Sequence, residues 1–395
     1  MATAIGHTIN RELRGDKAIW VIVFLLTLAS LLAVYSSSGS MAFRNNTYTE
    51  LYLIKHFIFI SFGLVLMYVC YKTHYMIYNK LAPLLVLISI PILLYTLFFG
   101  IDVNEARRWI EIPVLDLTFQ TSDFAKLALI VYLARSISQK QDHIKDFNTA
   151  FVPLILPVIV ICGLIAPSDL STAMLLFATC VLMMFIGRVD LKYIALLFGF
   201  GILLLSLLIV LGTFAPDMVR VGTWISRVRE FFYDTDGGYQ IQQAKIAISQ
   251  GEWFGVGPGN SVQRNFLPYP YADFIYAIIC EEYGLFGGFT IIFLYFLLIW
   301  RSTAIVTKSP KAFGAMLAIG LGLNIAVPAF ANIAVSLDLV PVTGLTLPMV
   351  SMGGTSLLFT CVSFGIILSV SKYVERVREH KMQLEELENL NESHH

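Results

Sequence analysis

The stretch Phe266-Leu-Pro-Tyr-Pro-Tyr-Ala-Asp-Phe-Ile-Tyr-Ala-Ile-Ile-Cys-Glu-Glu-Tyr-Gly284 joins a long polar loop to an apolar segment that can enter a membrane. Asp273 stands at this junction. An ionisable side chain at the edge of a membrane span is costly unless it has a partner or a function. Asp273 is therefore a candidate functional residue, although the residue type also suits a simple helix cap.

The composition around this stretch indicates a membrane protein. Of the 395 residues, 57% are hydrophobic and 14% are charged, and the mean hydropathy is +0.74. Soluble proteins carry about 25% charged residues. The apolar segments run along the whole chain, so residues 1–395 are interpreted as a single polytopic membrane domain. The formal net charge of zero gives no indication of nucleic-acid binding.

The fold class predicted from these segments is an all-α integral membrane protein with about ten transmembrane helices. A span needs about 20 apolar residues, and several of the segments are shorter than that. The predicted spans are 18–35, 51–71, 81–99, 124–137, 151–165, 170–186, 193–214, one that ends at 300, 313–336 and 356–374.

The eighth span allows two interpretations. One continuous helix from 274 to 300 would bury Glu281 and Glu282, at about 3 kcal/mol each near the bilayer centre. The favoured alternative is a short helix over 273–283 that ends at Gly284, followed by a span from Leu285. Glycine suits a helix C-terminus, and the two acids then lie near the interface or inside the bundle.

The distribution of basic residues places both termini in the cytoplasm, because cytoplasmic loops are enriched in lysine and arginine. This orientation makes 215–273 a large extracytoplasmic loop and 375–395 a cytoplasmic tail. Within the loop, 219–232 is predicted to be an interfacial amphipathic helix with its arginines toward lipid headgroups. Residues 239–249 are predicted to form a second helix. The glycines of 255–259 are interpreted as a plain loop rather than a phosphate cradle, since no P-loop lysine follows.

Other polar residues collect on the same outer face. Asp123 and Lys126 are three residues apart, so they share a helix face and are expected to pair. Arg107 and Arg108 suit either a substrate phosphate or a lipid phosphate. Asp169 suits either a ligand role or a helix N-cap. The prolines and glycines of 341–356 predict a re-entrant backbone that lines a cavity.

Seven motifs follow in order: ARRWI at 106–110, FQTSDFAK at 119–126, DLSTA at 169–173, YQ at 239–240, LP…ADFI at 267–275, EEYG at 281–284 and PVTGLTLP…SMGGTS at 341–356. Together they resemble the SEDS family of membrane proteins, which includes FtsW and RodA. The resemblance covers nearly the whole chain. The compact length and the end of the first span, 33–38, are more similar to FtsW.

The chain also departs from the family pattern. Gln-Pro-Ser-Glu is usual where this chain has Gln120-Thr-Ser-Asp123, and Pro-Asp-Leu-Gly-Thr is usual where it has Ser168-Asp-Leu-Ser-Thr172. The usual Glu-His-Thr before the key aspartate is replaced by Tyr-Pro-Tyr-Ala at 269–272. These changes concern the neighbours of Asp273 and leave the aspartate itself in place.

The resemblance implies a peptidoglycan glycosyltransferase of cell wall biogenesis, cell division and cell shape. Such an enzyme polymerises lipid II, the undecaprenyl-pyrophosphate-linked disaccharide peptide, at the outer face of the bacterial cytoplasmic membrane, here at the division septum. The expected catalytic residue is Asp273, as general base on the acceptor hydroxyl. A retaining enzyme needs a second carboxylate about 5 Å away, whereas Glu281 lies about 12 Å further along a helix. Inversion is therefore expected.

The remaining predicted site residues bind the substrate. Arg107, Arg108 or Lys126 is expected near the pyrophosphate, with Asp169 and Glu281 in the surrounding polar network. The re-entrant segment adds three more predicted substrate-binding residues, which are Ser351, Gly353 and Gly354.

The identity of any metal site is unknown from the sequence. A divalent cation, Mg²⁺ or Mn²⁺, is an expected cofactor for the pyrophosphate. The expected partners are a class B penicillin-binding protein transpeptidase and other division proteins. Two alternatives remain open, a lipid II flippase and a non-catalytic scaffold of the division complex.

Overall fold

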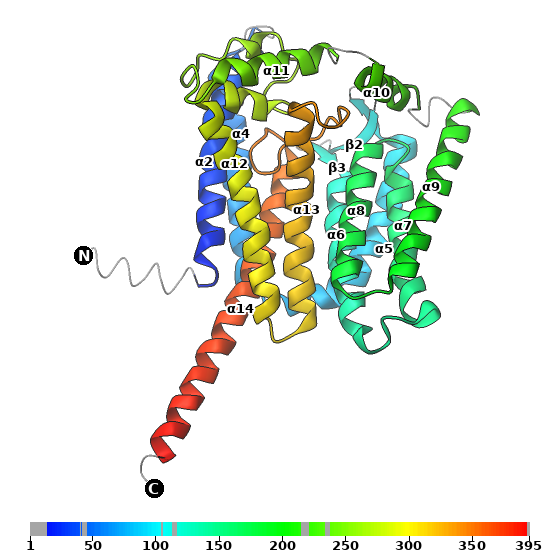
Figure 1. Cartoon of the computed structure of the whole chain (residues 1–395), viewed down its shortest axis with the longest axis vertical. Coiled ribbons are helices and arrows are strands. Elements are labelled where there is room, and N and C mark those ends of the chain that lie inside the picture. The colour runs from blue at the N-terminus through cyan, green and yellow to red at the C-terminus, as the bar shows by residue number, and fades with distance from the viewer. Residues whose placement is uncertain are drawn as a thin grey trace.

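The computed structural model describes residues 14–39, 41, 46–103, 106–112, 117–214, 221–233 and 238–392. It confirms an all-α membrane protein. Ten helices of this part of the chain stand side by side as a bundle (Figure 1). They are α2 (Lys17–Ser37), α4 (Thr49–Lys72), α5 (Met76–Phe99), α6 (Thr121–Gln139), α7 (Val152–Ile165), α8 (Leu170–Ile186), α9 (Leu191–Phe214), α12 (Ile275–Lys308), α13 (Ala312–Ser336) and α14 (Thr355–Glu392).

Length and apolarity distinguish two kinds of helix in this bundle. Eight helical segments of the described chain are long and apolar enough to cross a bilayer, with α7 counted together with the π-helix Phe147–Phe151 that precedes it. The helix α8 has 17 residues, and α6 carries Asp123 and Lys126. The N-terminal ends of these two helices carry the predicted site residues Lys126 and Asp169. Their polar residues are therefore placed by tertiary packing rather than by hydropathy.

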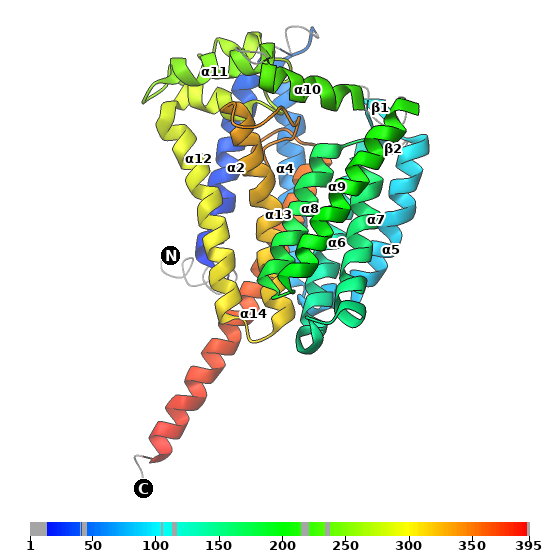
Figure 2. The ribbon, with the colours of Figure 1, turned by 45° about the vertical axis from the view of Figure 1, so that its right-hand side comes forward.

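The two ends of the bundle differ. One end, here called the loop end, carries α10 (Val221–Tyr233) and α11 (Tyr239–Gly251), which lie across the helix ends (Figures 1 and 2). Both were expected as helices of the long loop, and both are confirmed. At the opposite end, the last part of α14 extends away from the bundle.

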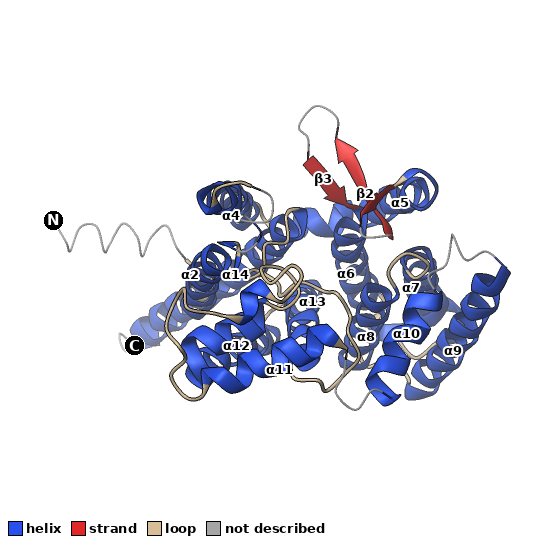
Figure 3. Ribbon diagram, turned by 90° about the horizontal axis from the view of Figure 1, so that it is seen from above, coloured by secondary structure: helices blue, strands red, loops and turns tan. Residues whose placement is uncertain are grey.

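The loop end also holds a small sheet between the predicted spans 81–99 and 124–137, where no strand was predicted. Strands β1 (Ile101–Val103), β2 (Ala106–Ile112) and β3 (Leu117–Gln120) pair antiparallel in the order β1-β2-β3. Figure 3 shows this sheet beside α5, at the edge of the bundle seen from above. Strands this short and rich in charge lack the long alternation that reveals a strand in sequence.

The break that was predicted in the eighth span is present at Gly284. Its φ of +67° interrupts α12, which begins at Ile275 rather than at residue 273. A Cβ at this position would lie 2.4 Å from the backbone of Trp253, so the site admits only glycine. The preference for two helices over one continuous span is therefore confirmed.

The break leaves backbone N–H and C=O groups of α12 without helical partners. The segment after α11 supplies hydrogen-bond partners for these groups. Val256 N and Gly257 N donate to the carbonyls of Glu281 and Glu282 at 2.9 and 3.1 Å. In return, Leu285 N and Phe286 N donate to the carbonyls of residues 252 and 253 at 2.8 and 3.4 Å. This exchange satisfies polar groups that a lipid environment would leave costly.

The predicted re-entrant segment lies between α13 and α14. Residues 337–354 form turns and irregular backbone with no helix or strand. Two buried side chains hold this segment in the bundle. Tyr295 Oη donates to the carbonyl of Pro348 at 2.5 Å, and Ser30 Oγ donates to that of Val350 at 2.8 Å. The irregular backbone is thus buried in protein, as the membrane requires.

Candidate active site

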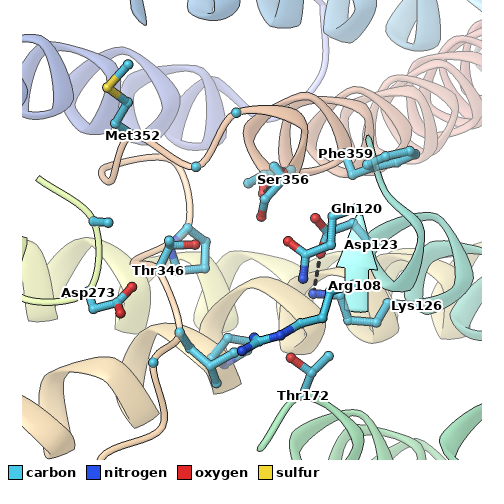
Figure 4. Close-up of a pocket in the computed structure, with 18 of the residues that line it drawn as sticks. Arg108, Gln120, Asp123, Lys126, Thr172, Asp273, Thr346, Met352, Ser356 and Phe359 are labelled. Carbon is cyan, nitrogen blue, oxygen red and sulfur yellow. Dashed lines mark hydrogen bonds and ion pairs between the residues drawn. The ribbon is translucent and has the colours of Figure 1, made fainter. Parts of the chain in front are cut away.

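A cavity of about 850 Å³ opens at the loop end, between α4, α6, α13, α14 and the re-entrant segment. Six of the predicted site residues line it, namely Arg108, Lys126, Asp169, Asp273, Gly353 and Gly354. Figure 4 shows Asp273 on one side of the cavity and Arg108, Asp123 and Lys126 on the other. Residues far apart in sequence thus meet around one space.

The backbone that carries Asp273 is fixed by three consecutive carbonyls. That of Tyr271 accepts from Met352 N at 3.0 Å, and that of Ala272 accepts from Ser351 Oγ at 2.6 Å. The carbonyl of Asp273 accepts from Asn332 Nδ2 at 2.7 Å. The re-entrant segment and α13 therefore set the position of the aspartate.

The carboxylate of Asp273 faces the cavity. Within the described part of the chain, no hydrogen-bond donor is in contact with its oxygens. Burial raises the pKa of this carboxyl above its ordinary value, and the charge of Asp169 acts in the same direction. The guanidinium groups of Arg108 and Arg227 oppose the rise. A carboxylate with free lone pairs and a raised pKa is suited to accept a proton.

The opposite side of the cavity is cationic and held by ion pairs. Arg108 Nη1 lies 2.8 Å from Asp169 Oδ2, and Lys126 Nζ lies 2.6 Å from Asp123 Oδ1. The second pair confirms the prediction from the spacing of three residues. Arg108 Nε and Asp123 Oδ2 have no hydrogen-bond partner among the described residues. These buried atoms are available to a polar ligand.

Asp169 fulfils both of the roles that its sequence position allowed. Its Oδ1 accepts from Thr172 N at 3.0 Å, which caps α8, while its Oδ2 binds Arg108. The cap fixes the carboxylate, and the carboxylate fixes the arginine. Asp169 therefore orients Arg108 at the cavity.

Arg227 is a lining residue that the sequence analysis assigned to lipid headgroups. Its Nη1 donates to the carbonyl of Thr343 at 3.3 Å. A Cβ on Gly344 would lie 3.6 Å from Arg227 Nη2 and 3.7 Å from Asp273 Oδ2, so both groups border this glycine. One signal was available in the sequence. Arg227 follows Trp224 by three residues, and Trp224 packs on the core, which places both on the inner helix face.

Two predicted substrate-binding residues lie outside the cavity lining. Ser351 is buried behind the loop of Asp273, where its Oγ donates to Ala272 O and accepts from Leu347 N at 2.8 Å. Glu281 is fully buried, and it accepts from Val262 N and Gln263 N at 2.8 and 3.2 Å and from Ser261 Oγ. Both residues support the site from behind rather than contact its contents.

Arg107 belongs to β2, but its side chain lies outside the described residues. Its expected contact with pyrophosphate stays a prediction. The cavity also contains residues that the sequence analysis did not single out for binding, which include Lys55, His56, Tyr269, Tyr271 and Thr346. Nothing in their local spacing marks them, because their proximity comes from the tertiary fold.

The carboxylates around the cavity do not form a dedicated metal site. Among the described residues, no group of three or more His, Cys, Asp or Glu side chains is placed to hold a metal ion. Asp169 and Asp123 each pair with a cation already. A divalent ion would need most of its ligands from phosphate oxygens, as Mg²⁺ often does.

Comparisons with known proteins agree with this fold. Residues 16–376 match the family of FtsW, RodA and SpoVE, described as cell cycle proteins. The chain is 32% identical over 372 residues to stage V sporulation protein E of Bacillus subtilis, covering 92% of this chain and 99% of that one. It is 34% identical over 364 residues to a probable peptidoglycan glycosyltransferase FtsW of Trichlorobacter lovleyi, covering 90% and 93%.

Two solved structures share the fold at low sequence identity. One, from a study of polymerization and crosslinking by a peptidoglycan synthase complex, has a TM-score of 0.71 at 22% identity. It covers 91% of this chain and 98% of that chain. The other is the rod shape determining protein RodA of Thermus thermophilus, with a TM-score of 0.66 at 21% identity. The match covers 91% of this chain and 97% of the RodA chain.

Proposed function

This chain belongs to the cell cycle protein family of FtsW, RodA and SpoVE, and we propose that it is a peptidoglycan glycosyltransferase that polymerises lipid II. The observation that carries the proposal is the arrangement of the cavity. A single unpaired carboxylate, Asp273, faces it from one side, and Arg108 and Lys126 face it from the other. A base and a cationic leaving-group site are what glycosyl transfer from a pyrophosphate requires.

In the proposed reaction, Asp273 takes the proton of the acceptor sugar hydroxyl as that oxygen attacks C1 of the donor sugar. The bond between C1 and the pyrophosphate oxygen breaks, and the lipid pyrophosphate leaves with the electron pair. Arg108 and Lys126 stabilise the negative charge that develops there. Arg227, which borders Asp273, would help to hold the substrates near the base.

The proposed stereochemical outcome is inversion. A retaining mechanism needs a second free carboxylate near the base. Asp169 and Asp123 are each committed to a cation, and the carboxylate of Glu281 is committed to residues 261–263. Single displacement with one base is therefore the favoured mechanism.

The orientation of the protein follows from its charges. The end opposite the loop end carries clustered basic residues between the helices and on α14, which the positive-inside rule assigns to the cytoplasm. The cavity then faces outside the cytoplasmic membrane, where lipid-linked sugars would be used. The similarity to FtsW proteins supports a role at the division septum.

A class B penicillin-binding protein transpeptidase is the proposed partner, together with other division proteins. The synthase complex with a similar fold supports an assembly of this type. A divalent cation also stays part of the proposal. Loss of polymerisation after chelation, restored by Mg²⁺ or Mn²⁺, is the expected result if phosphate oxygens supply its ligands.

The flippase alternative finds less support in the cavity. A flippase needs access to its site from both faces. Leu321 of α13 and Ile367 of α14, one turn further from the loop end than cavity-lining residues, are fully buried. The packing between these helices favours a site that opens on one side.

Purified protein incubated with labelled lipid II tests the function directly. The wild type should form glycan polymer, and Asp273→Ala should fold, insert and form none. Transfer of lipid II between leaflets with no polymer would instead support a flippase. Normal polymer yield from the Asp273→Ala variant would show that Asp273 is not the base.

A further inference from the structure

The side of the cavity next to α4 is lined by aromatic rings. Tyr269 and Tyr271, from the loop before Asp273, both line the cavity, with ring centroids 6.3 Å apart and planes at 89°. Tyr52 of α4 places its ring 6.2 Å from that of Tyr271. Tyr269 and Tyr271 lie in the stretch before Asp273 where the family that the chain resembles usually has Glu-His-Thr. The cavity therefore has an aromatic wall beside Asp273.

The loop before Asp273 contains a residue in an unfavourable backbone conformation. Tyr269 has a φ of +52°, in the left-handed region that non-glycine residues rarely adopt. Such strain persists only where the surrounding structure enforces it, and it concentrates at functional sites. The carbonyl of Tyr271 is bound by Met352 N, which fixes the backbone that carries the second ring. The backbone that presents the two rings to the cavity is therefore held in place.

The chemistry of Tyr271 suits a neutral polar ligand. Burial raises the pKa of its phenol to about 12. The hydroxyl therefore stays protonated at physiological pH and can donate a hydrogen bond. An aromatic face with a permanent donor beside it is suited to a sugar ring, which has apolar C–H faces and hydroxyl edges.

A cation stands one helical turn deeper on the same wall. Lys55 follows Tyr52 by three residues on α4, so it shares that helix face about 4.5 Å further along the axis. It lines the cavity, and no described acidic residue pairs with it. Its neighbour His56 is anchored by Ser30 Oγ at 2.7 Å, which fixes this part of α4.

Apolar residues continue the same wall. Ile58 and Phe59 of α4 line the cavity next. The order from the loop end is therefore aromatic, cationic and apolar. A lipid-linked sugar presents the matching order of sugar ring, pyrophosphate and hydrocarbon chain.

We propose that Tyr269, Tyr271 and Lys55 form the acceptor subsite, which binds the sugar ring and the pyrophosphate of the lipid whose hydroxyl attacks. This inference rests on the proposed glycosyltransferase function. Asp273 must touch the acceptor hydroxyl, and Tyr271 is two residues from Asp273 in the same fixed loop. The pair Arg108 and Lys126, on the other side, then serves the donor pyrophosphate. Each of the two lipid pyrophosphates thereby has its own cationic site.

Two forms of lipid II separate the subsites in one assay. A labelled lipid II with its acceptor hydroxyl blocked can only be a donor, and an unlabelled lipid II analogue with CH₂ in place of the oxygen between C1 and the pyrophosphate can only be an acceptor. Labelled product then requires one molecule of each. Varying one substrate while the other is saturating gives a separate KM for donor and acceptor.

Tyr271→Ala is expected to raise the acceptor KM about ten-fold, as loss of one aromatic stacking contact does. Tyr271→Phe, which keeps the ring, should retain most of the affinity. Lys55→Gln should raise the acceptor KM by a similar factor, because it removes one charge-assisted contact. The donor KM should stay unchanged in all three variants. Tyr95→Ala, an exposed tyrosine of α5 outside the cavity, is the matched control.

Thermal unfolding of each purified variant checks that it is folded, and the exposed Lys55 gives a second test if Tyr271→Ala fails to fold. A rise in donor KM, or no change in either KM, overturns the acceptor assignment while leaving the glycosyltransferase function intact. A wild type that forms no labelled product would instead contradict the proposed function itself.

Discussion

Asp273 and Glu281 are carboxylates eight residues apart, the first just before the short first part of α12 and the second near the end of that part. The oxygens of Glu281 accept hydrogen bonds from Ser261, Val262 and Gln263. Those of Asp273 face the cavity, and among the described residues protein donors bind its backbone carbonyl but not its carboxylate. Glu281 is fully buried, whereas Asp273 is half-buried at the wall of the cavity.

The difference lies in the lone pairs. A carboxylate whose lone pairs are filled by protein donors holds a loop in place, whereas one with free lone pairs can take a proton. The proposed base thus lies just before this short helix, and a carboxylate that holds a loop in place lies near its end. The predictions below test this division.

The largest expected effect is on the polymerisation rate, which should depend on Asp273 much more than on Glu281. Asp273→Asn should lower the polymerisation rate about 10²- to 10⁴-fold, because the amide cannot act as the base. The measurement is the initial rate with labelled lipid II. A folded Glu281→Gln variant should keep a rate much closer to wild type. Equal losses in both variants would remove the distinction.

The next largest effect concerns the break in α12 at Gly284, where the helix of Glu281 exchanges backbone hydrogen bonds with the segment after α11. Gly284→Ala should destabilise the protein by about 4 kcal/mol, from the left-handed φ and the overlap of Cβ with the backbone of Trp253. Thermal unfolding in detergent measures this change. Gly199→Ala, where an added Cβ meets nothing within 4 Å, should leave the stability unchanged or raise it slightly.

Glu281→Gln tests whether the hydrogen bonds of Glu281 stabilise the fold. The glutamine side chain carries N–H donors that would face the backbone N–H groups of Val262 and Gln263. These buried N–H groups therefore lose part of their hydrogen bonding. The expected loss is about 3 kcal/mol. Urea unfolding of the isosteric variant against wild type gives the value. Unchanged stability would mean that these hydrogen bonds contribute little.

A smaller effect is expected behind Asp273. Ser351→Ala removes the hydrogen bond to Ala272 O and the one from Leu347 N. The base should then be held less firmly, and kcat should fall about 10-fold with little change in either KM. Partial rescue by Ser351→Thr would indicate that the hydroxyl acts through position. A change confined to KM would place Ser351 in contact with substrate instead.

The smallest expected effect is on the thermal stability of an Asp273 variant. It is opposite in sign to the destabilisation expected for Glu281→Gln. Because burial raises the pKa of Asp273, the ionised form destabilises the fold above its ordinary pKa. Asp273→Asn should therefore raise Tm slightly at pH 7. The gap should close as the pH falls through the raised pKa and the wild-type carboxyl becomes protonated. A lower Tm for the variant at pH 7 would contradict this.

The sequence predicted the features that depend on local spacing. Apolar runs gave the helices, Gly284 gave the break, and a separation of three residues gave the pair Asp123–Lys126. Each of these depends on residues within a few turns of one another. Hydrophobic periodicity and single-residue conformational preferences are sufficient at that range.

The sequence did not predict features that depend on distant contacts. The position of Ser351 behind Ala272, the entry of Arg227 into the cavity and the meeting of Tyr52 with Tyr271 all come from the tertiary fold. The short strands β1, β2 and β3 were missed because pairing, not propensity, defines them. Glu281 was expected in the polar network around the site, and its hydrogen bonds to residues 261–263 were not predicted for the same reason.

The exchange of backbone hydrogen bonds at Gly284 also bears on biogenesis. Residues 252–257 and the broken helix each supply the groups that the other lacks. Neither half is satisfied by itself, so the eighth span can reach its final form only after the preceding loop has been translocated. Synthesis from the N-terminus delivers the loop first, which is the order this assembly needs. The loop that carries Asp273 lies between these two parts, and it also needs Asn332 and Met352, which are made later still.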